Sequence, residues 1–253
     1  MNEKTSYRQS HSAPGYSQRY NANYAIGYYA AIFREIELPI LKQLFSELCD
    51  GRGSLLDFAC GTGRITQIAK PYFQRVVGVD VSEEMLCSAK ASDGPIFICE
   101  DITKKPLNER FSVITAFRFF LNAEDSLRTD ALTAIRNHLT PDGRLICNIH
   151  MNSRSIMGIF YSMTRWIPGL AHHQTLSYKK FSRMLEANGL KVEQVIWYGV
   201  LPRPGRFFAR ILDRWVGPTE RIFAALGLQG QFAHSFMIVA QLADGKLSMI
   251  DQS

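Results

Sequence analysis

The chain has 253 residues, of which 46% are hydrophobic and 21% are charged, as is usual for a globular protein with a core of normal size. Its five cysteines include no Cys-x-x-Cys pair, which argues against a disulfide framework or a zinc site and favours a reducing compartment. No apolar run reaches the roughly 18 residues of a membrane-spanning helix, and the polar first 20 residues lack signal-peptide character. These features predict a cytoplasmic protein and leave open a peripheral contact with the inner face of the membrane.

The net charge of +6 is distributed unevenly along the chain. Residues 1–149 hold 17 basic and 17 acidic side chains, whereas residues 150–253 hold 12 basic and 6 acidic ones. A basic C-terminal part can contact anionic partners such as phosphates, lipid headgroups or nucleic acid, and a solvated basic face explains it equally well.

The first part of the chain predicts helices. Residues 1–15 are polar and are expected to be loose. Residues 16–48 predict N-terminal helices, because apolar side chains recur near a spacing of 3.6 residues. Pro39 is expected either to break this stretch or to begin its second helix.

Strands and helices then alternate between residues 54 and 150. The expected strands are 54–59, 75–79, 95–99, 111–117 and 144–149, and the expected helices are 64–72, 82–90 and 124–139. Ser82 is the expected N-cap of the second helix, and Thr-Pro-Asp-Gly at 140–143 predicts a turn.

Residues beyond 150 are less regular. They predict a helix at 178–188 that ends at Gly189, a strand at 191–198 and a final strand at 234–242. The whole pattern predicts an α/β, Rossmann-like, doubly wound and mostly parallel seven-stranded sheet with helices on both faces. N-terminal helices and a helical insertion before the last strand would complete it.

The strongest local signal is Leu-Leu-Asp-Phe-Ala-Cys-Gly-Thr-Gly-Arg at 55–64, which reads as a buried strand, a tight glycine turn and a helix. Gly61 and Gly63 allow the backbone to approach a ligand closely. In such sheets ligands bind beyond the C-terminal ends of the strands. Asp80 ends the second strand, where an acid can accept both hydroxyls of a ribose, and Asp101 follows the third strand, where it could accept the amine of an adenine.

This series of motifs resembles the class I S-adenosylmethionine-dependent methyltransferases, in their general bacterial small-molecule branch. Residues 57–64 look like the first motif of that family, and Asp80, Asp101-Ile102 and the 139–143 turn are similar to its later landmarks in order and spacing. The resemblance covers residues 16–150 and continues more weakly to the end. It implies S-adenosylmethionine as the cofactor and one methyltransferase domain, 1–253. Residues 54–150 would be the cofactor core, 151–190 and 199–232 a substrate cap and insertion, and 243–253 a tail.

The resemblance also implies roles for individual residues. Asp57 would order the glycine turn and support the methionine amino group, and Asp80 would hold the ribose. The family often has glycine where this chain has Ala59, and we expect no loss of binding from that difference. The implied cofactor-binding set is Arg19, Tyr20, Asp57, Ala59, Cys60, Gly61, Thr62, Gly63, Asp80, Val81, Met85, Asp101, Ile102 and Phe117, without a metal.

The sequence indicates the methyl acceptor less clearly than the cofactor. The absence of an Asn-Pro-Pro-Tyr motif after the fourth strand counts against methylation of DNA, and no acidic cluster suits Mg²⁺. His150 follows the fifth strand, where it could deprotonate a hydroxyl or merely form a hydrogen bond at the strand end. Arg118 could hold an anionic acceptor or form a salt bridge. We therefore expect O-methylation of a glycan, a lipid-linked intermediate or a secondary metabolite, with His150 and Arg118 as the candidate catalytic residues.

A basic amphipathic segment at 203–226 is a further feature. Arg206, Arg210 and Arg214 recur every four residues opposite an apolar side, and Gly217-Pro218 is expected to break the helix. Such a helix can lie on an anionic membrane or receive a lipid-linked substrate, and it can also pack on its own domain.

Two other functions remain open. One is a nucleic-acid or membrane-surface binding protein on a methyltransferase-like fold, driven by the basic C-terminal part. The other is an NAD(P)-dependent Rossmann enzyme, whose glycine fingerprint would require Gly or Ala at the position of Thr66. The sequence does not indicate the oligomeric state.

Overall fold

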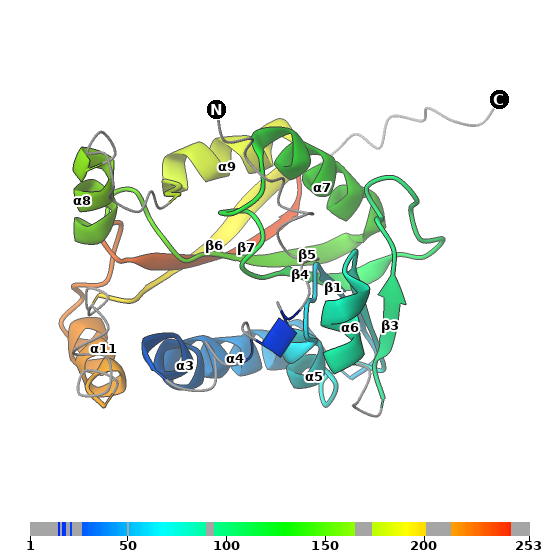
Figure 1. Cartoon of the computed structure of the whole chain (residues 1–253), viewed down its shortest axis with the longest axis horizontal. Helices are drawn as coiled ribbons and strands as arrows, with labels where there is room; N and C mark the ends of the chain where they lie inside the picture. The colour runs from blue at the N-terminus through cyan, green and yellow to red at the C-terminus, as the bar shows by residue number, and fades with distance from the viewer. Residues whose placement is uncertain are drawn as a thin grey trace.

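The computed structural model describes residues 15, 17–18, 21, 27–49, 51–89, 94–164, 174–200 and 214–243. These residues form a central sheet with helices on both of its faces (Figure 1). The strands are β1 (Ser54–Phe58), β2 (Arg75–Asp80), β3 (Ile96–Cys99), β4 (Phe111–Ala116), β5 (Leu139–Ile149), β6 (Leu190–Tyr198) and β7 (Ser235–Leu242). The helices are α3 (Tyr28–Ile32), the π-helix η1 (Phe33–Glu37), α4 (Leu38–Leu48), α5 (Arg64–Ala69), α6 (Glu83–Ala89), α7 (Asp125–His138), α8 (Ile156–Thr164), α9 (Tyr178–Ala187) and α11 (Val216–Ala225).

The described sheet has seven strands in the order β3-β2-β1-β4-β5-β7-β6. Strands β1 to β5 run parallel, whereas β7 pairs antiparallel with both β5 and β6. The predicted fold class is therefore confirmed. The antiparallel β7 distinguishes this sheet from the dinucleotide-binding order 3-2-1-4-5-6.

The core lies on both faces of the sheet, because parallel strands covered by helices are buried on both sides. Neighbouring residues of β1 show this: Leu56 packs in the cluster beneath α7 and α9, whereas Leu55 packs in the cluster beneath α3, α4 and α5. Both side chains are fully buried. The order of the strands reverses between β1 and β4, so a ligand crevice is expected beyond their C-terminal ends.

The structure decides three local predictions. Pro39 lies in the first turn of α4, so it begins the second helix, which was one of the two expected outcomes, and the helical run passes from α3 through η1 into α4. Residues 140–143 do not form a separate turn but belong to β5, where the pairing register shifts between Phe111 and Val113. Gly217-Pro218 lies in the first turn of α11, where proline is tolerated, whereas Arg206, Arg210 and the rest of 201–213 lie outside the described residues.

Other predictions agree with the structure. Ser82 caps α6, because its Oγ accepts a hydrogen bond from the Met85 amide at 3.3 Å. Gly189 follows α9 with a φ of +76°, as expected for the glycine beyond a helix end. In the described part of the chain, every helix is too short or too polar to cross a bilayer.

Candidate cofactor and acceptor site

A cavity of about 270 Å³ opens beyond the C-terminal ends of β1, β2, β4 and β5. The structure brings nearly all described residues of the expected site to its wall. Those that line it are Asp57, Ala59, Cys60, Gly61, Thr62, Asp80, Val81, Met85, Asp101, Ile102, Phe117, Arg118 and His150. Arg19 and Tyr20 lie outside the described residues.

Asp57 connects the first strand to the helix that follows it. Its Oδ2 accepts hydrogen bonds from the amide of Thr66 at 3.0 Å and from the Thr66 hydroxyl at 2.6 Å, and its Oδ1 accepts one from the Thr115 hydroxyl at 2.8 Å. Burial raises the pKa of Asp57 to about 6, although these hydrogen bonds oppose the rise. Thr66 therefore has a specific role at the position where a dinucleotide fingerprint would require Gly or Ala.

The turn between β1 and α5 holds three residues in left-handed backbone conformations: Ala59 (φ +54°), Gly61 (φ +57°) and Gly63 (φ +74°). Gly63 does not line the cavity. A Cβ atom there would lie 2.9 Å from the Phe97 ring and 3.0 Å from Ala89, so this glycine allows the start of α5 to pack closely against its neighbours. The family often has glycine at the position of Ala59, and this position has a positive φ, the conformation that glycine adopts most easily.

Replacing Ala59 by glycine is expected to raise the free energy of unfolding by about 0.5–1 kcal/mol. The left-handed conformation costs an L-residue about 1–2 kcal/mol, and the greater freedom of glycine in the unfolded chain offsets part of this gain. Urea unfolding of Ala59→Gly measures the difference. The matched control is Ala131→Gly in the interior of α7, which should lose stability; a loss of stability in both variants would contradict the prediction.

Two carboxylates at the ends of the next two strands also line the cavity. Asp80 ends β2, and its Oδ2 accepts from the Gly61 amide at 2.8 Å while Oδ1 accepts from the Ser82 amide at 2.9 Å. Asp101 follows β3, and its Oδ1 accepts from the Thr103 hydroxyl at 2.6 Å. Because a carboxylate has about four acceptor positions, Asp80 can still accept hydrogen bonds from a ligand.

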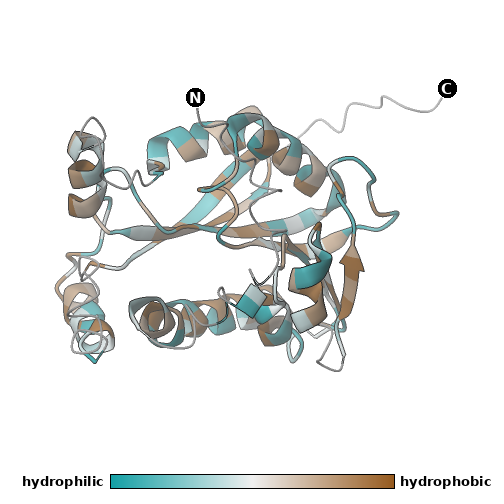
Figure 2. Ribbon diagram, in the orientation of Figure 1, coloured by the Kyte–Doolittle hydropathy of each residue, from teal (hydrophilic) through white to brown (hydrophobic). Residues whose placement is uncertain are grey.

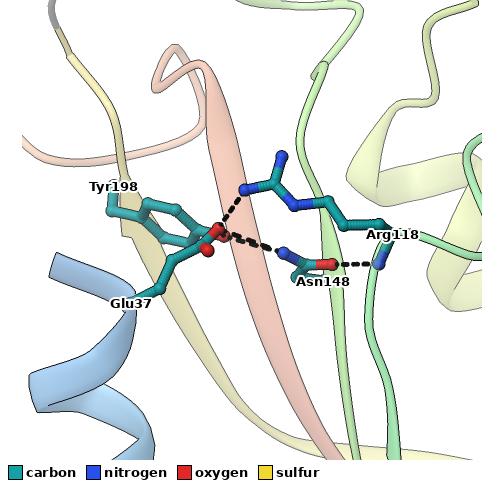
Figure 3. Close-up of polar contacts among 4 residues, drawn as sticks. All are labelled: Glu37, Arg118, Asn148 and Tyr198. Atoms are coloured by element: carbon teal, nitrogen blue, oxygen red, sulfur yellow. Dashed lines mark hydrogen bonds and ion pairs between the residues drawn. The ribbon is translucent and has the colours of Figure 1, made fainter. Parts of the chain in front are cut away.

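A buried polar cluster joins Arg118, which lines the cavity, to Glu37, Asn148 and Tyr198 (Figure 3). Three donors converge on one oxygen, Oε1 of Glu37: the Arg118 guanidinium at 2.8 Å, the Tyr198 hydroxyl at 2.7 Å and the Asn148 amide at 3.1 Å. Asn148 also accepts from the backbone amide of Arg118 at 2.9 Å. Glu37 is fully buried and Arg118 is 7% exposed, so this ion pair is shielded from water.

The backbone around this cluster is unusual. Glu37 ends the π-helix η1, and Arg118, two residues after the end of β4, adopts a φ of +59°. Both features are more frequent at functional sites than elsewhere. Burial and the Glu37 carboxylate raise the pKa of Tyr198 well above its usual value, so its hydroxyl stays protonated and donates. Arg118 thus forms the salt bridge that the sequence left as an alternative.

His150 and the N-terminal helices complete the wall. His150 directly follows β5 and is half-buried at the cavity. The Tyr29 ring also lines the cavity, with its centroid 5.7 Å from Cζ of Arg118, and Cζ of Arg64 lies 4.1 Å from the centroid of Phe33. Further wall residues without a role in the sequence analysis are Glu100, Thr103, Phe119, Asn122 and Leu127. Groups of three or more potential metal ligands are absent from the part of the chain that the structure describes.

Comparison with known proteins agrees with this geometry. Residues 56–147 match the family described as a methyltransferase domain. Residues 56–147 thus belong to a methyltransferase domain, and the fold around them is that of the class I S-adenosylmethionine-dependent methyltransferases. The matched part of this domain runs from β1 to β5 and includes the glycine turn, Asp80 and Asp101.

Relatives of the methyltransferase domain include the "Probable S-adenosylmethionine-dependent methyltransferase CRG1" of Saccharomyces cerevisiae, which is 33% identical over 70 residues. This match covers 28% of the chain and only 24% of that relative. The magnesium protoporphyrin IX methyltransferase of Synechocystis PCC 6803, solved with bound SAH, has a TM-score of 0.63 at 13% identity and covers 94% of this chain and 98% of its own. A methyltransferase from Clostridium acetobutylicum has a TM-score of 0.58 at 17% identity and covers 89% and 98%. At these identities, the structures support the fold of the methyltransferase domain.

Proposed function

We propose that the chain transfers the methyl group of S-adenosylmethionine to a hydroxyl group of a small-molecule acceptor. The observation that carries the proposal is that the glycine turn, Asp80 and Asp101 line one cavity together with His150. A glycan, a lipid-linked intermediate or a secondary metabolite could each supply such a hydroxyl.

The cavity residues are complementary to the cofactor's hydrogen-bond donors. Asp80 would accept the two ribose hydroxyls, Asp101 the adenine amine and Asp57 the methionine ammonium. Val81 and Met85 would pack against the adenine, Ile102 would meet its edge, and Thr62 and Phe117 would contact the methionine part through their backbone. The supporting observation is that these three carboxylates line one cavity.

His150 would act as the general base. When bound, the cofactor supplies an electrophilic methyl group on a sulfonium, whose C–S electron pair returns to sulfur as the new C–O bond forms. His150 would take the proton that the acceptor hydroxyl loses, a role that histidine fills more often than any other residue. Holding the hydroxyl in line with the C–S bond is the other contribution of the cavity wall.

In this proposal Arg118 does not bind an anionic acceptor. Its guanidinium is paired with Glu37, so its positive charge is compensated before any acceptor binds. This pairing supports a neutral acceptor rather than an anionic one. Arg118 would instead position the end of β4, and with it the backbone of Phe117, beside the cofactor.

Methyl transfer can be tested with S-adenosylmethionine that carries a labelled methyl group and a panel of neutral hydroxyl acceptors. Wild-type protein should label at least one acceptor, and His150→Gln should lower kcat by about 10²–10⁴-fold while cofactor affinity stays unchanged. The pH–rate profile of the wild type should show a basic group that the variant lacks. Equal kcat values for the two proteins would remove His150 from the mechanism.

A further inference from the structure

Exposed apolar side chains are concentrated in two short segments outside the catalytic cavity. Of the eleven large hydrophobic residues exposed in the described chain, nine lie in residues 156–163 and 215–232. We call these nine the apolar end surface: Ile156, Ile159, Phe160, Met163, Trp215, Ile222, Leu226, Leu228 and Phe232. Contiguous exposed apolar surface on a soluble protein usually marks an interaction site.

Helix α8 presents a complete amphipathic stripe to solvent. Ile156, Ile159, Phe160 and Met163 follow the i, i+3, i+4, i+7 spacing that places side chains on one helix face. In a globular protein this face normally packs on the core, yet Ile156 and Met163 are each 74% exposed. Figure 2 shows the apolar character of α8 at one end of the molecule, the end where α11 also lies. The stripe thus has no cover within the described chain.

The second segment is joined to the first through Asn152. The Asn152 side-chain amide donates to the carbonyl oxygens of Gln231 and Ala233 at 2.7 and 2.9 Å, and its backbone amide donates to the His234 carbonyl at 2.8 Å. These bonds tie the chain that enters α8 to the chain that follows α11. In α11 itself Ile222 and Leu226 are exposed, one helical turn apart, so the described residues leave these two side chains largely uncovered.

Three exposed arginines border the apolar end surface: Arg154 and Arg214 precede the two segments and Arg221 lies within the second one. The exposed Glu35, whose carboxylate lies close to Gly217, is paired with Arg34, so this pair adds no net charge. Glu220, the acid among the described residues of the same segments, is buried and accepts hydrogen bonds from the Val200 amide and from Gln229. Apolar side chains with a basic border match an anionic lipid surface, where acyl chains receive the former and headgroups the latter. A second copy of the chain would bring arginines against arginines.

We propose that the apolar end surface docks the protein on anionic lipid bilayers. Residues 156–163 and 215–232 insert their apolar side chains at the headgroup boundary, and Arg154, Arg214 and Arg221 contact the phosphates. Along the chain, α8 begins seven residues after the end of β5, the strand that His150 directly follows. This inference concerns a surface and stands independently of the reaction proposed above.

Co-sedimentation of the full chain with vesicles tests this proposal. Vesicles of phosphatidylcholine and phosphatidylserine should bind the wild type, whereas vesicles of phosphatidylcholine alone should bind it at least tenfold more weakly, and added salt should reduce the difference. Phe160→Ser/Met163→Ser tests the apolar stripe and Arg154→Glu/Arg221→Glu tests the border; each should lower binding at least tenfold. The matched control is Ile96→Ser/Arg110→Glu, which changes exposed residues of the same kinds elsewhere and should bind like the wild type.

Several outcomes would overturn the proposal. These are no binding of the wild type to anionic vesicles at low salt, equal binding to both kinds of vesicle, and full binding by either surface variant. Circular dichroism of each variant ensures that a loss of binding is not a loss of folding. Dimers that depend on Phe160 and Met163 in analytical ultracentrifugation, without vesicle binding, would assign the surface to a second copy instead.

Discussion

Replacing Asp80 by alanine is expected to weaken the binding of S-adenosylhomocysteine by at least about 100-fold. Two hydrogen bonds to a charged acceptor contribute about 1.5–3 kcal/mol each, and 1.4 kcal/mol corresponds to a factor of ten. The variant also removes the acceptor of the Gly61 amide, so the glycine turn loses one of its fixed contacts. Isothermal titration calorimetry of both proteins at the same pH and salt concentration measures the change.

The matched control for this experiment is Asp130→Ala, which removes an exposed carboxylate on α7, away from the cavity. It should bind S-adenosylhomocysteine like the wild type, because screening by water makes a distant surface charge negligible. An Asp80→Ala variant that folds and binds within threefold of the wild type would show that the ribose is held elsewhere.

Replacing Glu37 by leucine is expected to destabilise the fold by about 3–5 kcal/mol, because the buried Arg118 guanidinium then lacks its counter-charge. The Tyr198 hydroxyl and the Asn148 amide lose the same acceptor. The double variant Glu37→Leu/Arg118→Leu should recover a large part of this loss, since replacing both members of a buried pair is far less costly than removing one. Urea unfolding of the single and double variants measures both effects.

An exposed ion pair provides the control for Glu37. Arg75 donates two hydrogen bonds to Glu109 at 2.9 Å, but both side chains are accessible to water. Glu109→Leu should therefore cost less than about 1 kcal/mol. If Glu37→Leu proved as mild as Glu109→Leu, the buried polar cluster would not hold the N-terminal helices to the sheet.

The cofactor side of the site could be predicted from the sequence because its residues follow strands in regular order. In a parallel sheet the C-terminal ends of adjacent strands meet at one edge, so the glycine turn, Asp80 and Asp101 had to come together once β1, β2 and β3 were recognised. Local rules also identified the Ser82 cap and Gly189. The sequence indicates less about how the strands pair. Residues 140–143, where a turn was expected, belong to β5, and the pairing of β5 with β4 shifts register there.

The acceptor side could not be predicted in the same way. Glu37 and Tyr198 are 161 positions apart, and a glutamate within a helical pattern normally indicates an exposed position. Only tertiary packing brings η1 against the ends of β4, β5 and β6 and turns Glu37 into a buried anion. The apolar side expected for residues 203–226 can be followed only from residue 214 on, where Trp215, Ile222 and Leu226 are exposed, and their exposure depends on how α11 packs.

The central claim is that the turn after β1 and the carboxylates after β2 and β3 contact one adenosyl ligand, and a crystal structure of the complex with S-adenosylhomocysteine tests it most directly. The predicted electron density places the ribose against Asp80, the adenine between Val81 and Asp101, and the methionine part over residues 59–63. Density for the ligand at any other place, or side chains that fill this cavity in the complex, would contradict the assignment.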